Sequence, residues 1–399
     1  WFSSNSFELR QSFEDDKSSR QQWEETYTKG LDLLGLNYTE RSQPFQGASG
    51  VTHPLLAESV TQFQAQAYKE LLPASGPVRT QIIGQATKDK EDQAQRVSDF
   101  MNYQIMHVME EYDPELDQML FYLPLAGSTF KKIYYDAALG RAVSKFIPAE
   151  DLVVPYTATN LEECERVTHI LKRTDNDIKK MQVTGFYRDV DLQVVQEENK
   201  VEEKERKLSG IEKTGYRDDQ YTLLEMHVDL DVPGFEDPDG IKLPYIITID
   251  EGSGNVLSIY RNYKDGDTLY KKQQYFVHYK FMPGLGFYGL GLIHMIGGLS
   301  RTATAALRQL IDAGTLANLP AGFKARGLRI ADDDSPIQPG EFRDVDAPSG
   351  DLRAGLLPLP YKGADPTLFQ LLGFCVQAGK EFATVADQKI GDAANAGAP

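Results

Sequence analysis

Apolar residues recur at helical spacing over a long stretch at about positions 292–319. The stripe is made mostly of small residues, namely Leu299, Ala303, Ala306, Leu310, Ala313 and Ala317. Gln309 and Asp312 lie off this stripe, and Pro320 ends the run. The pattern predicts an unusually long helix. Its small side chains favour close packing against another helix.

Three further stretches, at about 55–72, 89–112 and 366–389, have the same amphipathic spacing. The second of these is expected to bury one face, which carries Val97, Met101, Ile105, Val108 and Tyr112. Another helix is expected within 169–187, where Thr174 can cap the first turn. Positions 191–215 are rich in charge and predict a solvated helix or a mobile loop.

Alternating patterns predict strands in the remaining parts of the chain. Segments 127–136 and 140–156 read as two strands around an Ala-Ala-Leu-Gly turn. Four more segments, 221–230, 243–250, 255–263 and 273–281, predict a small antiparallel module inserted between helical sections. Strands at 321–330 and 355–361 are expected to flank an acidic loop that contains Asp332, Asp333 and Asp334. The expected fold class is α+β.

The glycines from Gly284 to Gly289 match the spacing GxGxxG of dinucleotide-binding proteins. That function requires a βαβ unit and an acidic residue at the end of a second strand. Here the following residues continue as a helix, and Asp312 lies within it. We therefore interpret these glycines as a hinge that lets the backbone turn sharply or lets another chain come close.

Composition and charge exclude further classes of function. The 399 residues carry a net charge of −17, which argues against a basic groove that grips nucleic acid. No apolar run is long enough to span a membrane. The six histidines stand apart without metal-binding spacing, and neither Cys164 nor Cys375 resembles a nucleophile. We expect no catalytic site, no metal and no cofactor, and thus a structural protein.

Several blocks of the sequence resemble the portal proteins of tailed bacteriophages, above all those of short-tailed, P22-like phages and their marine relatives. The most specific blocks are residues 284–323, which contain the long helix, and PAEDLVVPY at 148–156. Residues 44–71, 123–136 and 365–387 add to the resemblance, which extends from about position 20 to the end. Portals form a ring, usually of twelve subunits, through which DNA enters and leaves the capsid.

The resemblance implies a division of the chain into the parts of a portal subunit. The wing would comprise residues 1–165 and 320–390, and the clip would comprise 187–285. The first stem helix would cover 166–186 and the second 286–319, with Leu299, Ala303, Ala306, Leu310 and Ala313 at the packing seam. Residues 391–399 would begin the loop that points into the channel. The crown helices that follow in portals are missing from this sequence, so we expect a piece of a longer chain.

The same resemblance implies a location and a set of partners. The ring would lie at the portal vertex of the virion and would assemble in the host cytoplasm. Partners would be terminase, the major capsid and scaffolding proteins, head–tail adaptors, and double-stranded DNA that passes through with weak binding. Gln388, Lys389 and Asn395 would lie nearest the DNA path. The alternatives are another ring-forming or scaffold protein, or an enzyme whose active site forms between subunits.

Overall fold

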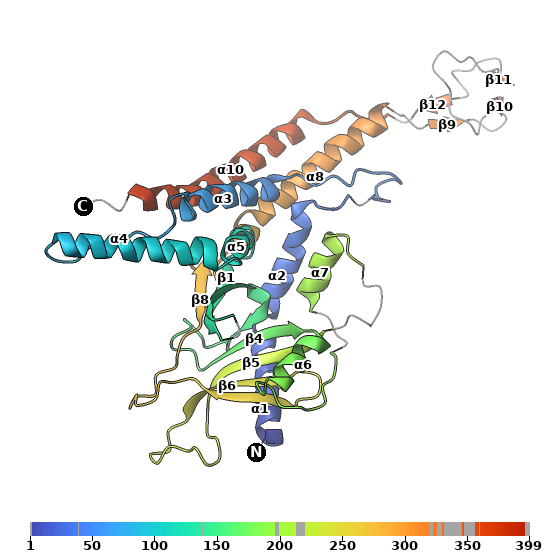
Figure 1. Ribbon diagram of the computed structural model, residues 1–399. Helices are drawn as coiled ribbons and strands as arrows, with labels where there is room; N and C mark the ends of the chain where they lie inside the picture. The colour runs from blue at the N-terminus through green and yellow to red at the C-terminus, as the bar shows by residue number, and fades with distance from the viewer. Residues whose placement is uncertain are drawn as a thin grey trace. The chain divides into compact units, whose positions relative to one another are not determined.

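A computed structural model describes most of the chain. The described residues are 2–38, 40–137, 139–195, 199–212, 220–318, 322–324, 329–330, 345–346, 356–358 and 360–395. They form two compact units. The first comprises Trp1–Leu36, Pro54–Gly298 and Gly379–Pro399, and the second comprises Asn37–His53 and Leu299–Ala378. The fold is mixed α+β with antiparallel strand pairing, as expected (Figure 1).

The first unit contains two antiparallel sheets. The larger has the order β3 (Leu152–Val153), β4 (Arg166–Arg173), β5 (Tyr221–Leu230), β6 (Leu243–Asp250) and β7 (Val256–Arg261). The smaller has the order β2 (Arg141–Pro148), β1 (Ser128–Asp136) and β8 (Phe276–Lys280). The hairpin expected from the Ala-Ala-Leu-Gly turn is therefore confirmed as β1 and β2, paired from Asp136 with Arg141 onward. The second strand, expected to reach residue 156, ends at Pro148, and β3 joins the larger sheet instead.

The inserted β-module differs from the expectation in two ways. Strands β5, β6 and β7 pair as expected, but β8 leaves them and pairs with β1. Residues 166–173, expected in a first stem helix over 166–186, instead form β4 and pair along their length with β5. Val167, Thr168 and Ile170 are β-branched, which favours a strand here. The helix in this region is limited to α6, Asp175–Val183, which Thr174 caps as predicted through a 3.3 Å bond from the Asp177 amide.

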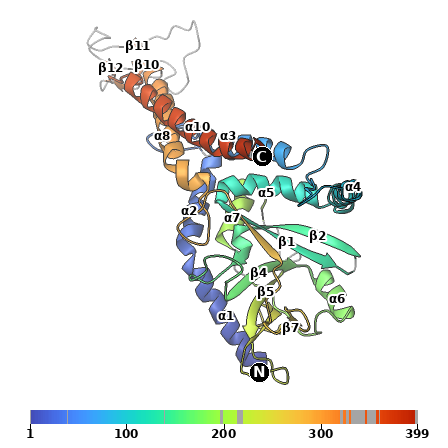
Figure 2. The ribbon, with the colours of Figure 1, turned by 90° about the vertical axis from the view of Figure 1, so that its left-hand side faces the viewer.

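Helices surround these sheets. Helices α1 (Phe2–Ser19) and α2 (Gln21–Leu31) begin the unit, and α5 (Tyr112–Ala126) packs on the smaller sheet. Figure 2 shows α1 beside the larger sheet, where Phe13 contributes to a core with Met226 and Ile247. A second core brings together residues of α2, η1 (Asp32–Leu34), α3 (Leu55–Leu71), α5, α7 (Lys200–Leu208) and the first turns of α8.

Helix α4 (Lys88–Tyr103), which continues as the π-helix η2 (Gln104–Val108), contradicts the expectation of a buried face. No residue of α4 or η2 is buried within the described part of the chain. Phe100 is 62% exposed, Tyr103 55% and Met101 45%. The periodicity correctly predicted a helix, but most of its apolar side stays exposed. Ile105 and Val108 are half-buried, and Tyr112 belongs to α5, where it packs against a core cluster.

The second unit contains most of α8 (Leu292–Asn318), which begins in the first unit, and the first part of α10 (Pro366–Asn395). Short strand pairs join β9 (Gly322–Lys324) to β12 (Leu356–Pro358) and β10 (Arg329–Ile330) to β11 (Val345–Asp346). The three aspartates at 332–334 lie outside the described residues. Helix α10 ends later than the expected 389, and alanines at 393 and 394 favour that extension.

Candidate functional site

The small-residue stripe lies on α8, but the chain itself covers part of it. Ala303 is 0% exposed and Ala306 is 3% exposed, whereas Leu299, Leu310 and Ala313 are partly buried. All five belong to the second unit, where the neighbouring segment is Asn37–His53. The middle of the stripe therefore packs within one chain. Leu310 and Ala313 retain exposed surface.

The segment at 49–53 is held along α8 by side chains one helical turn apart. The Asp312 carboxylate accepts from the Ser49 amide at 2.7 Å, and the Arg308 Nε donates to the Val51 carbonyl at 2.7 Å. The Thr304 hydroxyl accepts from the His53 amide at 3.1 Å. The spacing i, i+4, i+8 places the three side chains on one face of the helix. We call these three side chains the α8 ladder.

The ladder corrects the expected role of Asp312. The sequence pattern placed it off the packing stripe, yet it is 6% exposed and also lies 3.3 Å from the Arg41 guanidinium. The apolar pattern gave no indication that the adjoining polar residues of the α8 ladder bind main-chain groups. Ala306 belongs to the expected packing seam, but it is buried inside the second unit. The substitution Ala306→Glu would place a charge in this interior, so we expect it to disturb the fold of the unit as well as any contact between subunits.

The expected DNA-path residues Gln388, Lys389 and Asn395 lie in the last turns of α10, where the structure describes the backbone and not the side chains. Nearer the start of the helix, Phe369 and Phe374 are each 68% exposed. Further along, Gly379 lies against Leu55, and Lys380 forms a 2.9 Å ion pair with Glu58. The end of α10 in the first unit is thus anchored to α3.

The glycine-rich loop at 284–291 lies directly against the turn between α5 and β1. A Cβ on Gly289 would lie 2.3 Å from the Gly127 carbonyl oxygen, and one on Gly291 would lie 2.4 Å from that of Leu125. The Gly289 amide donates to Ser128 Oγ at 2.7 Å, and the Gly291 amide donates to His294 Nδ1 at 3.1 Å. The glycines permit close approach within the chain, and these two amides are already occupied. This arrangement does not suit a phosphate-binding loop.

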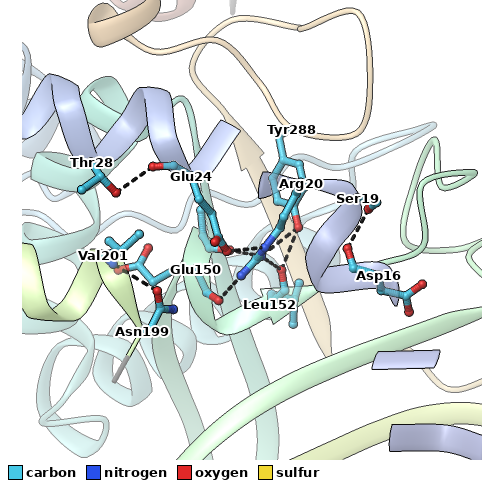
Figure 3. A network of polar contacts seen from close by, with 11 residues as sticks. Asp16, Ser19, Arg20, Glu24, Thr28, Glu150, Leu152, Asn199, Val201 and Tyr288 are labelled. Atoms are coloured by element: carbon cyan, nitrogen blue, oxygen red, sulfur yellow. Dashed lines mark hydrogen bonds and ion pairs between the residues drawn. The ribbon is translucent and has the colours of Figure 1, made fainter. Parts of the chain in front are cut away.

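Arg20 is the centre of a buried polar network (Figure 3). Its Nη1 donates to the carbonyls of Ala149 and Leu152 at 2.9 and 2.8 Å, and its Nη2 donates to the Glu150 carbonyl. The Nε atom forms a 2.9 Å ion pair with Glu24. The Tyr288 hydroxyl lies 3.0 Å from Nη1. One side chain therefore joins the start of α2 to the 3-10 helix η3 (Ala149–Asp151) and to the glycine-rich loop.

A second cluster brings together histidines that stand apart in the sequence. Lys132 contacts both oxygens of Glu225, and His227 Nε2 lies 3.0 Å from Glu225 Oε1. Burial would raise the pKa of Glu225, but the His227 hydrogen bond and the Lys132 charge hold that pKa well below its usual range. Burial lowers the pKa of His169, which lies opposite Glu225 in the sheet, to about 3. A buried, paired cluster of this kind supports structure and offers no open site for a substrate.

The described residues contain no group of three or more metal-binding side chains with suitable geometry, and no described helix has the length and apolarity to span a membrane. A cavity of ≈ 500 Å³ lies along β7, lined by aromatic residues that include Phe186, Tyr187 and Tyr260. Two of its lining residues are hydrogen-bonded to each other, since the Arg188 amide donates to the Leu257 carbonyl of β7 at 2.9 Å.

Sequence reasoning missed the Arg20 and Glu225 clusters because their members are far apart along the chain. One local signal was present: Glu225 and His227 are separated by one residue in a predicted strand, so their side chains share a face. For Arg20 no comparable signal exists. A scan of the sequence against models of protein families finds no match, and a search of curated proteins finds no similar sequence.

Proposed function

We propose that this chain is a portal-type subunit that assembles into a closed ring around a DNA channel at one capsid vertex. The proposal rests first on the sequence blocks described above. It is supported by the 27-residue helix α8, which lies within residues 286–319, where the resemblance places the second stem helix, and by the unit of antiparallel sheets and helices. No catalytic role is part of this proposal.

The observation that carries the assembly is the exposure of two apolar surfaces on different helices. The first, on α4 and η2, contains Val97, Phe100, Met101, Tyr103 and Met106. The second, on α10, contains Leu371 and Phe374, and Phe369 is exposed on another side of that helix. Contiguous exposed apolar surface commonly marks an interface. A ring requires a heterologous contact, in which two different surfaces of each subunit meet. A chain with two such surfaces meets this requirement.

The charge of the chain is consistent with a channel that does not hold DNA. A net charge of −17 per subunit repels phosphate, so duplex DNA could pass without tight binding. Within this proposal the partners are terminase, capsid and scaffolding proteins, head–tail adaptors, and the DNA itself. Gln388, Lys389 and Asn395 remain the residues proposed to lie closest to the DNA.

Native mass spectrometry and negative-stain microscopy of the purified chain test this function. The expected result is a closed ring, about twelvefold, with a central hole wide enough for duplex DNA. A protein that stays monomeric at tens of micromolar, or that forms open filaments, would contradict the proposal. A ring whose opening is too narrow for DNA would favour a different ring-forming protein. Nucleotide hydrolysis by assembled rings would favour an enzyme with an inter-subunit site.

A further inference from the structure

Helix α7, from the charge-rich stretch expected to be solvated, is docked on the core of the first unit. Asn199 caps it through a 3.1 Å bond from the Val201 amide. Val201 is 0% exposed and belongs to the same core as Tyr27 and Leu31 of α2. The helix therefore carries charge on one face and a core residue on the other.

A carboxylate of α7 is inserted among phenol groups. Glu205 Oε1 accepts from the Tyr27 hydroxyl at 3.4 Å, and Oε2 accepts from the Tyr122 hydroxyl at 3.3 Å. Tyr27 is 0% exposed. No described cation forms an ion pair with Glu205; the α7 lysine Lys204 pairs instead with Asp32 at 2.6 Å. Glu205 is thus solvated by neutral donors at the contact between α7 and the core.

A second carboxylate, that of Glu150, lies near enough to the same phenols to raise their pKa values and forms no ion pair within the described part of the chain. Glu150 is 2% exposed, and its Oε2 has no hydrogen-bond partner among the described residues. The nearby Arg20 guanidinium donates to main-chain carbonyls, to Tyr288 and to Glu24, and not to the Glu150 carboxylate. Burial raises the pKa of Glu150, and the charge of Glu205 raises it further. The charge of Arg20 acts in the opposite direction on Glu150, but it forms no ion pair with either carboxylate. Two poorly solvated carboxylates that have no ion-pair partner are most stable when they share a proton.

We propose that a proton held by the Glu150–Glu205 pair keeps α7 docked, and that loss of this proton at higher pH releases α7 from the core. Release would expose Tyr27, Tyr122 and the site that Val201 fills. The charged and titratable groups around the pair come from six elements and from the residue before α2. They are Arg20, Glu24 and Tyr27 at α2, Asp32 in η1, Tyr122 in α5, Glu150 and Asp151 in η3, Lys172 in β4, and Glu202 and Lys204 in α7.

The charges of these groups and their ion pairs determine whether α7 is released at low or at high pH. Lys172 pairs with Glu202, and Lys204 pairs with Asp32, so neither ammonium group is an ion-pair partner of Glu205 or Glu150. Burial raises the pKa of Glu205 to about 7 in the docked state. Because a solvent-exposed glutamate titrates at a lower pH, docking takes up a proton. The docked state is therefore favoured at low pH and weakens as the pH rises toward and beyond 7.

Hydrogen exchange of the full chain, corrected for the intrinsic effect of pH, tests the switch. We expect the protection of amides 200–208 to fall on the order of tenfold or more between pH 5 and pH 8.5. Amides of β5 serve as an internal reference, and their protection should change much less. In Glu205→Gln the fall should be much smaller, because the amide keeps the shape of the side chain and removes one of the titrating carboxylates.

Glu203→Gln is the matched control, since it removes the same charge from a partly exposed position on α7, where Glu203 pairs with Lys207 at the surface. It should retain the wild-type fall. The proposal would be overturned if protection in the wild type did not change with pH, or if Glu205→Gln showed the same fall in protection as the wild type. It would also be overturned if Glu203→Gln reduced the fall as much as Glu205→Gln does. If Glu205→Gln does not fold, Glu150→Gln replaces it, with the same expectation of a flattened pH response.

Discussion

At the scale of single residues, Arg20 shows how one side chain can organise distant segments. Its guanidinium donates hydrogen bonds to three main-chain carbonyls within residues 149–152. This contact therefore depends little on which side chains those residues carry. Its charge is matched by Glu24. Removal of one member of a buried ion pair is costly because the remaining charge stays in a poorly solvated place.

We expect Arg20→Met to reduce the free energy of unfolding by about 3–5 kcal/mol, since Glu24 and the three carbonyls lose their donor. Urea denaturation of the purified chain measures this change. Lys29→Met is the control, because Lys29 lies on α2 and pairs with Glu25 at the surface. That variant should lose less than about 1 kcal/mol. Equal effects of the two substitutions would show that Arg20 has no special role.

His169 provides a second prediction at this scale. Its pKa is lowered to about 3 by burial, so the folded protein holds it neutral while the unfolded chain protonates it nearer 6.5. The stability it contributes is present above about pH 6.5 and is lost as the pH falls toward 3. As the pH falls through this window, the unfolding free energy of His169→Asn should therefore decrease less steeply than that of the wild type. The two slopes should differ by up to about 1.4 kcal/mol per pH unit. His107→Asn, at an exposed position, should follow the wild-type slope.

At the scale of elements, the glycine-rich loop depends on direct contact between backbones. Gly289 and Gly286 are three residues apart in the same loop, but a Cβ at Gly289 would meet the Gly127 carbonyl oxygen, while one at Gly286 meets no heavy atom within 4 Å. Neither has a positive φ. A substitution at each position therefore separates steric crowding from backbone preference.

We expect Gly289→Ala to lower the unfolding free energy by about 1–3 kcal/mol through overpacking. Gly286→Ala should be close to neutral. Thermal unfolding monitored by near-ultraviolet circular dichroism measures both. A neutral Gly289→Ala would mean that the loop and the α5–β1 turn do not touch in solution.

The elements themselves were largely predictable from periodicity. Helices α3, α8 and α10 and the β1–β2 hairpin follow from local spacing, and so does the Thr174 cap. Strand partners were harder, because alternation indicates a strand and says nothing about its neighbour. Alternation alone therefore predicts β8 beside β5–β7, and the resemblance predicts a helix at residues 166–173, where the structure has a strand. The buried clusters around Arg20 and Glu225 depend on these partners, so they could not be predicted before the sheet order was known.

At the scale of the whole molecule, the exposed apolar surface of α4 gives a direct test of assembly. Phe100 is 62% exposed, so a charge there should leave the subunit folded. If the chain assembles into the proposed rings, Phe100→Glu should convert them to smaller species, as measured by light scattering after gel filtration, with an unchanged melting temperature. Ile83→Glu is the control, since Ile83 is 94% exposed outside the helices. A Phe100→Glu protein that assembles like the wild type would exclude α4 from the interface.

The α8 ladder has a consequence for how such a sequence can diverge. Thr304, Arg308 and Asp312 bind the amides and carbonyls of residues 49–53, which every amino acid except proline supplies in full. Selection for this contact would therefore act mainly on the helix and less on the side chains of the bound segment, among which the Thr52 hydroxyl accepts from Arg308 at 3.4 Å. Relatives of this protein should be recognisable by a fixed Thr-x₃-Arg-x₃-Asp spacing in their long helix, even where residues 49–53 share no letters. A search for ancestry is best centred on that spacing.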